Sequence, residues 1–222
     1  MTRATNARIA GITLLAYIAA GLTSMTLFGR AAAGEGIPAR LASIAQHAPE
    51  VRIVLVLGLL ESFAALVLAV TLHAITRDRD PDLAMLALVC RTVEGVLVGL
   101  SVSTTLALRW LAGATGLEAG AAVALGGYLL RNEVALTASF FAVGSTLFAW
   151  LLLRGRAIPA PLAGLGVLAS VLLVVGLPLQ LAGLVGGAAA SLMWLPMLAF
   201  EVPLGLWLVA RGVAPAPAPV PA

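Results

Sequence analysis

The sequence predicts an all-α, polytopic integral membrane protein, a helical bundle of about six transmembrane helices. Of its 222 residues, 61% are hydrophobic and only 10% are charged, and the mean hydropathy is +1.08. A soluble domain is about half apolar and about a quarter charged, and a disordered chain has low hydrophobicity with dense charge. The long apolar runs do not alternate polar and apolar residues as the strands of a membrane barrel do. Membrane-spanning helices are the class that remains.

Six stretches of the chain are long and apolar enough to be spans, because a helix crosses the hydrocarbon with about 20 apolar residues. They cover residues 9–28, 51–75, 83–108, 132–153, 162–182 and 188–210. The first stretch, 9–28, is preceded by Arg3 and Arg8. Basic residues before an apolar run are also typical of a cleavable signal peptide. The apolar core of a signal peptide is only about 7–15 residues long, however, so we expect 9–28 to be a retained first helix.

The connections between these spans are short, which leaves one six-span membrane domain over residues 1–213. We expect a short helix near 39–47 and an interfacial helix within the Gly- and Ala-rich connection 109–131. Alternating proline and alanine from residue 214 to residue 222 predict a disordered, polyproline-like tail.

The orientation in the membrane is predicted from the arginines. All 13 Lys or Arg residues of the chain are arginine. One set of short loops and ends carries seven of them: Arg3, Arg8, Arg77, Arg79, Arg154, Arg156 and Arg211. The opposite set carries five: Arg30, Arg40, Arg52, Arg109 and Arg131. Because the arginine-rich side is cytoplasmic, we expect both termini in the cytoplasm of a multi-pass protein of the bacterial plasma membrane.

Four ionisable residues fall well inside the spans: Glu61, Arg91, Glu94 and Glu201. A charge at mid-bilayer costs ~2.5–3.5 kcal/mol, so each needs a partner or water. Arg91 and Glu94 are three residues apart and can face each other on one helix. At a rise of about 1.5 Å per residue all four can lie near the midplane. We expect Glu201, rather than Glu61, to be the second partner of Arg91, because both lie in the cytoplasmic half.

Gly95 and Gly99 continue the helix face that carries Arg91 and Glu94, within an arc of about 140°. Glycines four residues apart let helix backbones approach closely in membranes. This face should therefore point into the bundle.

Three classes of function are open for this charge cluster. It can bind a small molecule or an ion, in a transporter that at this length would work as a homo-oligomer. It can hold helices in register in a non-catalytic scaffold or regulatory partner. It can also supply a glutamate as acid or base in an intramembrane enzyme. The sequence has no HExxH, GxSxG, CxxC or Walker A motif, so we assign no catalytic residue, cofactor or metal ligand. The arginines are scattered rather than clustered, which excludes nucleic acid and leaves the lipid bilayer as the expected partner.

Three motifs carry a resemblance to a known family. They are the Arg91-Thr92-Val93-Glu94 run, LLLRGRAIPAPL at 151–162 and FEVPLGLWLVARG at 200–212. Over residues 8–212 the chain resembles the bacterial membrane family catalogued as domain of unknown function 4386. The matching positions are Arg91, Glu94, Arg154, Ile158, Pro159, Glu201, Trp207 and Gly212. Gly155 stands where the family pattern has Ser, and Pro161 where it has an aromatic or basic residue. The resemblance implies a six-helix membrane fold and supplies no activity.

Overall fold

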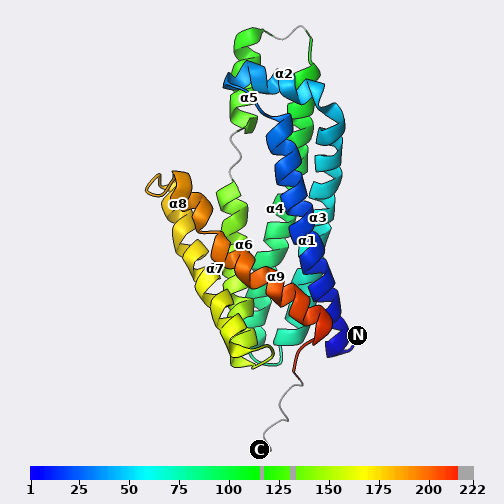
Figure 1. Cartoon of the computed structure of the whole chain (residues 1–222), viewed down its shortest axis with the longest axis vertical. Helices are drawn as coiled ribbons and strands as arrows, with labels where there is room; N and C mark the ends of the chain where they lie inside the picture. Colours follow the sequence, from blue (N-terminus) through cyan, green and yellow to red (C-terminus); the bar gives the residue numbers. More distant parts are fainter. Residues whose placement is uncertain (116–117, 131–133, 215–222) are drawn as a thin grey trace, which may run out of the picture. The chain divides into compact units, whose positions relative to one another are not determined.

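The chain folds into helices joined by turns (Figure 1). The computed structural model describes residues 1–115, 118–130 and 134–214, and this part of the chain contains no strand. Apart from Ala214, the expected Pro/Ala tail lies outside the described residues.

The helices have the following bounds: α1 Arg3–Ala31, α2 Gly36–Gln46, α3 Ala48–Thr76, α4 Pro81–Gly113, α5 Ala119–Leu130, α6 Val134–Arg154, α7 Ala160–Leu181, α8 Gly187–Leu192 and α9 Leu195–Ala210. By length and composition, six stretches could cross a membrane. They are α1, α3, α4, the stretch 119–154 that contains α5 and α6, α7, and the stretch 187–210 that contains α8 and α9. The predicted fold class is confirmed.

Contacts divide the chain into two compact units. The first unit consists of residues 1–16, 64–94 and the described chain from 135 onward, and the second of residues 17–63 and 95–134. Helices α1, α3 and α4 contribute residues to both units. The single domain expected over 1–213 stays a prediction, and each unit is described by itself.

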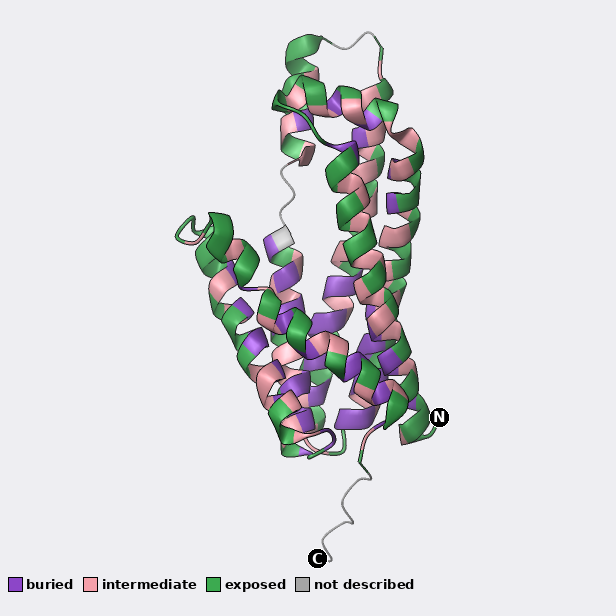
Figure 2. Ribbon diagram, in the orientation of Figure 1, coloured by how far each residue is buried: buried purple, intermediate pink, exposed green. Residues whose placement is uncertain are grey.

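In the first unit, α7 and α9 lie side by side (Figure 1). Their buried residues recur every three or four positions, from Ala163 to Leu177 on α7 and from Met197 to Leu208 on α9. Figure 2 shows that exposed positions alternate with these buried ones along both helices. The two helices touch at Gly166, where an added Cβ atom would lie 2.5 Å from the Phe200 ring.

Helix α1 packs on α9 at a pair of glycines, Gly11 and Gly205. A Cβ atom at Gly11 would lie 2.7 Å from the carbonyl oxygen of Gly205. Such close backbone approach is the packing that small residues permit between apolar helices.

One end of the first unit collects the N-terminus, the α3–α4 turn, the α6–α7 turn and the end of α9 (Figure 1). Arg3 Nη1 lies 3.6 Å from Asp78 Oδ2, and Arg79 Nη2 donates to the carbonyl oxygen of Gly155 at 3.4 Å. The Ala214 amide donates to the carbonyl oxygen of Ala157 at 2.9 Å. These segments carry the arginines that the sequence assigns to the cytoplasmic side.

In the second unit, α2 packs against α5. Leu41 of α2 shares a buried cluster with Leu108 and Leu111 of α4, and a Cβ atom at Gly126 of α5 would lie 2.9 Å from Ile37. These two short helices fall where the sequence predicts them, near 39–47 and within 109–131.

The expected GxxxG surface of α4 meets α3 in this second unit. The Ser62 hydroxyl donates to the carbonyl oxygen of Gly95 at 2.8 Å. A Cβ atom at Gly99 would lie 3.0 Å from the same hydroxyl oxygen. The glycines therefore leave room for a polar contact between two apolar helices.

The last predicted span, 188–210, differs from the expectation because it is not one continuous helix. Helix α8 ends at Leu192, and α9 begins at Leu195 with Pro196 in its first turn. Proline is favoured there because the first amides of a helix have no intrahelical partner to lose. Pro178 and Pro203, by contrast, lie inside α7 and α9. The fourth span, expected from residue 132, has its described helix from Val134 onward.

Candidate functional site

Arg91 and Glu94 form a buried ion pair on one face of α4. Arg91 Nη1 lies 2.8 Å from Glu94 Oε2, as their spacing of three residues predicts. Only 2% of Arg91 and 1% of Glu94 are exposed. The attraction within an ion pair of this length offsets part of the free-energy cost of removing both charges from water.

Helix α6 covers the arginine of this pair. The guanidinium carbon of Arg91 lies 4.8 Å from the centre of the Phe141 ring, within the range of a cation–π interaction. One turn further along α6, Gly144 leaves space for the aliphatic part of the same side chain, since an added Cβ atom would lie 2.8 Å from Arg91 Cγ. The aromatic ring and the glycine together fix the position of the guanidinium.

Phe141 also connects this arrangement to α9. Its ring centre lies 6.1 Å from that of Trp194, the residue that precedes α9. Aromatic pairs at this separation attract beyond their shared burial. The start of α9 is therefore packed on the ring that covers Arg91.

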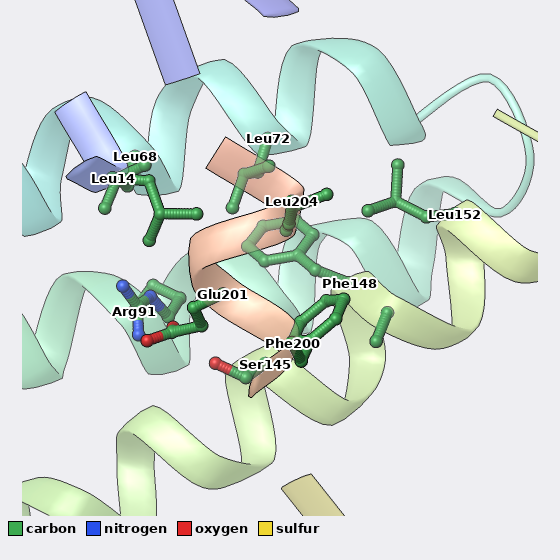
Figure 3. Close-up of a pocket in the computed structure, with 11 residues that line it drawn as sticks. Leu14, Leu68, Leu72, Arg91, Ser145, Phe148, Leu152, Phe200, Glu201 and Leu204 are labelled. Carbon is green, nitrogen blue, oxygen red and sulfur yellow. The ribbon is translucent and has the colours of Figure 1, made fainter. Parts of the chain in front are cut away.

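Glu201, from the middle of α9, lines the same small cavity as Arg91, and Figure 3 shows the two side chains pointing toward one another. The cavity has a volume of about 30 Å³. Its lining includes the hydroxyl-bearing Ser145 of α6, and the rest is apolar: Leu14, Leu68, Leu72, Phe148, Ala149, Leu152, Phe200 and Leu204. Glu201 itself is half-buried. The Arg91 guanidinium attracts an ionised Glu201 carboxylate, and the Glu94 carboxylate repels it.

Formal charges make this cluster acidic overall when both carboxyls are ionised, with one guanidinium and two carboxylates. Coulomb interactions are several times stronger in an apolar interior than in water. The cluster therefore favours an additional positive charge near Glu201 over an anion.

Glu61 belongs to the second unit. Its carboxyl accepts a hydrogen bond from the side chain of Ser24, and its Oε1 atom is buried without a hydrogen-bond partner. Gly21 lies beside it, where an added Cβ atom would lie 3.6 Å from Oε2. The grouping of Glu61 with the other three ionisable residues stays a prediction.

Three residues of this site were missed by reasoning from the sequence: Phe141, Gly144 and Ser145. Aromatic residues, glycine and serine are all common in membrane helices, so none of the three stands out alone. The adjacent Gly144 and Ser145 were the available signal, as a small and a polar residue in the middle of an apolar run.

Within the described residues, no three or more His, Cys, Asp or Glu side chains are grouped as ligands for a metal ion. Cys90, next to Arg91 in sequence, is a buried free thiol. The polar groups of the site are the Arg91 guanidinium, the carboxyls of Glu94 and Glu201, and the Ser145 hydroxyl.

Six helical stretches that could cross a membrane and an ionisable cluster within them fit a multi-pass membrane protein. The chain belongs to the family described as Domain of unknown function (DUF4386), whose model matches residues 9–212. The resemblance to domain of unknown function 4386 is thereby confirmed. No curated protein and no solved structure matches the chain. The family description assigns no activity.

Proposed function

We propose that this chain is a membrane protein that binds a small monovalent cation, a proton or Na⁺, at the Arg91 cluster, defined as Arg91, Glu94 and Glu201. The observation that carries the proposal is the cavity shared by Arg91 and Glu201. An ionisable group inside a span is by default a sign of an ion or proton pathway.

Charge supports a cation rather than an anion. Arg91 is paired with Glu94 at 2.8 Å, and Glu201 brings a second carboxyl to the same guanidinium. In apolar surroundings an ionised Glu201 makes the cluster net negative. Binding a proton or a cation at Glu201 removes this excess charge.

Size supports an ion rather than a metabolite. The cavity of about 30 Å³ holds one or two water molecules or one dehydrated ion. Pockets for organic ligands measure about 300–1,000 Å³. The same comparison argues against an intramembrane enzyme, because an organic substrate does not fit beside Glu201.

A carrier of this kind has to bring the cluster into contact with each side of the membrane in turn. With 222 residues, we propose that it does so as a homo-oligomer in the plasma membrane of a bacterium, with both termini in the cytoplasm.

A purely structural role for the Arg91 cluster is the second candidate. The observation that favours it is the near-complete burial of Arg91 and Glu94 under the Phe141 ring. Buried ion pairs can specify how helices pack without binding anything. This candidate predicts stability effects and no response to cations.

The test is the melting temperature of the detergent-solubilised protein, titrated with NaCl against N-methylglucamine chloride at constant ionic strength and also across pH. A ligand at 100 times its Kd stabilises the folded state by about 2.7 kcal/mol, which is several degrees for a chain of this size. We expect stabilisation by Na⁺ if Na⁺ is the ion, and rising stability as pH falls if it is a proton.

Glu201→Gln should abolish this response, because the neutral amide resembles a protonated carboxyl and cannot attract a cation. The matched control is Glu35→Gln, which removes an exposed carboxyl beside α2. A wild-type protein insensitive to Na⁺, with a pH response unchanged in Glu201→Gln, would refute cation binding and leave the structural role.

A further inference from the structure

A second, larger cavity lies at the end of the first unit that holds the N-terminus, the α6–α7 turn and the end of α9. Its volume is about 460 Å³. One wall is the α6–α7 turn, residues 156–159, and the other is Trp207 with residues 211–214 at the end of α9. These two walls come from the second and third of the sequence motifs, and the cluster at Arg91 uses neither Arg156 nor Arg211.

The α6–α7 turn places an arginine where glycine is the most stable residue. Helix α6 ends in a Schellman motif, in which the Ala157 amide donates to Leu152 O and the Arg156 amide donates to Leu153 O, both at 3.0 Å. Arg156 occupies the left-handed position of this motif, with φ of 48°. Glycine is usual there because a Cβ atom is strained at positive φ. Because glycine would be more stable in this turn, the presence of arginine at position 156 indicates that its side chain has a role outside the turn.

Both walls of this cavity are fixed by hydrogen bonds. The Ala214 amide donates to Ala157 O at 2.9 Å, which joins the segment after α9 to the turn. Behind the turn, Arg79 Nη2 donates to Gly155 O at 3.4 Å. A Cβ atom at Gly155 would lie 2.9 Å from Leu151 O and 3.2 Å from Arg79 Nε, so the turn and Arg79 are closely packed here. The cavity is therefore preformed.

The cavity is level with the ends of two candidate spans. Helix α6 ends at Arg154 and α9 at Ala210, so exposed Arg156 and Arg211 directly follow the apolar stretches. Trp207 lies one turn inside the end of α9 and lines the cavity with them. Tryptophan is enriched at the depth of lipid headgroups, and basic pockets between spans on the cytoplasmic side bind anionic headgroups.

We propose that this cavity binds the headgroup phosphate of an anionic phospholipid. Two guanidinium groups can hold a phosphate by charge-assisted hydrogen bonds, and arginine suits this better than lysine because its donors form a planar fork. A volume of about 460 Å³ accommodates a headgroup, which the cavity at Arg91 does not. The acyl chains would lie along the apolar surfaces of the adjoining spans.

The experiment measures the melting temperature of the full-length protein in a neutral detergent during titration with dioctanoyl phosphatidylglycerol, dioctanoyl phosphatidylcholine or inorganic phosphate. We expect phosphatidylglycerol to stabilise the protein at concentrations where phosphatidylcholine does not. Because each arginine near a headgroup contributes on the order of a fivefold change in affinity, Arg156→Gly and Arg211→Gln should each weaken phosphatidylglycerol binding about fivefold.

Arg156→Gly also separates binding from folding. Glycine relieves the left-handed backbone, so without lipid this variant should melt at the same temperature as the wild type or higher, while it loses lipid affinity. The control is Arg77→Gln, which removes an equal charge from an exposed arginine of the α3–α4 turn outside the cavity lining.

Three results would overturn the proposal. Equal stabilisation by phosphatidylcholine would show that the cavity does not distinguish an anionic headgroup from a zwitterionic one. An equal loss of affinity in Arg77→Gln would show a diffuse attraction rather than a site. Equal stabilisation by inorganic phosphate alone would assign the cavity to a free phosphate and not to a lipid.

Discussion

The aliphatic part of the Arg91 side chain passes so close to Gly144 of α6 that a Cβ atom there would lie 2.8 Å from Arg91 Cγ and 3.0 Å from Arg91 Cδ. The same added Cβ atom would lie 3.3 Å from the carbonyl oxygen of Ala87. At its far end the guanidinium is held by Glu94 and by the Phe141 ring. Arg91 therefore cannot move aside without giving up one of these contacts.

Gly144→Ala should destabilise the protein for this reason. Inserting a methyl group into packed surroundings costs about 1–3 kcal/mol, which corresponds to a fall of several degrees in Tm. The matched control is Gly164→Ala in α7, where an added Cβ atom meets nothing within 4 Å. Alanine favours a helix over glycine by about 1 kcal/mol, so the control should melt at the same temperature or higher. Equal behaviour of the two variants would contradict the close contact.

Arg91→Ala should cost about 3–5 kcal/mol, because it leaves buried carboxyls without their guanidinium. Replacing the whole cluster, with Arg91→Met, Glu94→Gln and Glu201→Gln together, should recover much of this loss. The measurement is the thermal stability of the solubilised single and combined variants. If Arg91→Ala lowers Tm no more than a substitution at an exposed apolar position such as Leu168, the buried-pair interpretation is wrong.

Gly11→Ala should weaken the packing of α1 on α9. The added methyl group would meet the Gly205 carbonyl oxygen at 2.7 Å, and a backbone atom cannot rotate away as a side chain can. We expect a loss of about 1–3 kcal/mol in a thermal melt. Gly29→Ala on the same helix is the control, since an added Cβ atom there has no neighbour within 4 Å. A stable Gly11→Ala protein would show that the two helices do not touch at this point.

Reporter fusions should place the loops 76–82 and 154–161 on the same, cytoplasmic side. The sequence motivates this through seven arginines against five, and the contacts Arg3–Asp78 and Arg79–Gly155 join these turns at one end of the first unit. The measurement compares a phosphatase active only outside the cytoplasm with a fluorescent protein that folds inside it. Phosphatase activity at either loop would reverse the predicted orientation.

Features set by local chemistry could be predicted from the sequence. The number and approximate limits of the candidate spans follow from apolar length, which has to match the bilayer thickness. The Arg91–Glu94 pair follows from helical geometry alone, because residues three apart are neighbours on any α-helix. The short helix α2 was likewise expected near its observed limits, Gly36–Gln46.

Features that depend on which helices meet could not be predicted. Depth along the spans favoured Glu201 over Glu61 as the second partner of Arg91, but only the packing of α9 brings the Glu201 side chain to the cavity that Arg91 lines. The contact of Phe141 with Arg91 likewise exists only where α6 packs against α4.

By itself, then, the sequence determined that this protein is a bundle of apolar helices carrying a charge pair inside one of them, because apolar length and helical periodicity act within a single segment. The tertiary structure decided that Glu201 faces Arg91 and that Arg156 and Arg211 border one cavity. The physical reason is that a single helix presents side chains on all its faces. Only the packing of neighbouring helices determines which of those side chains share a site.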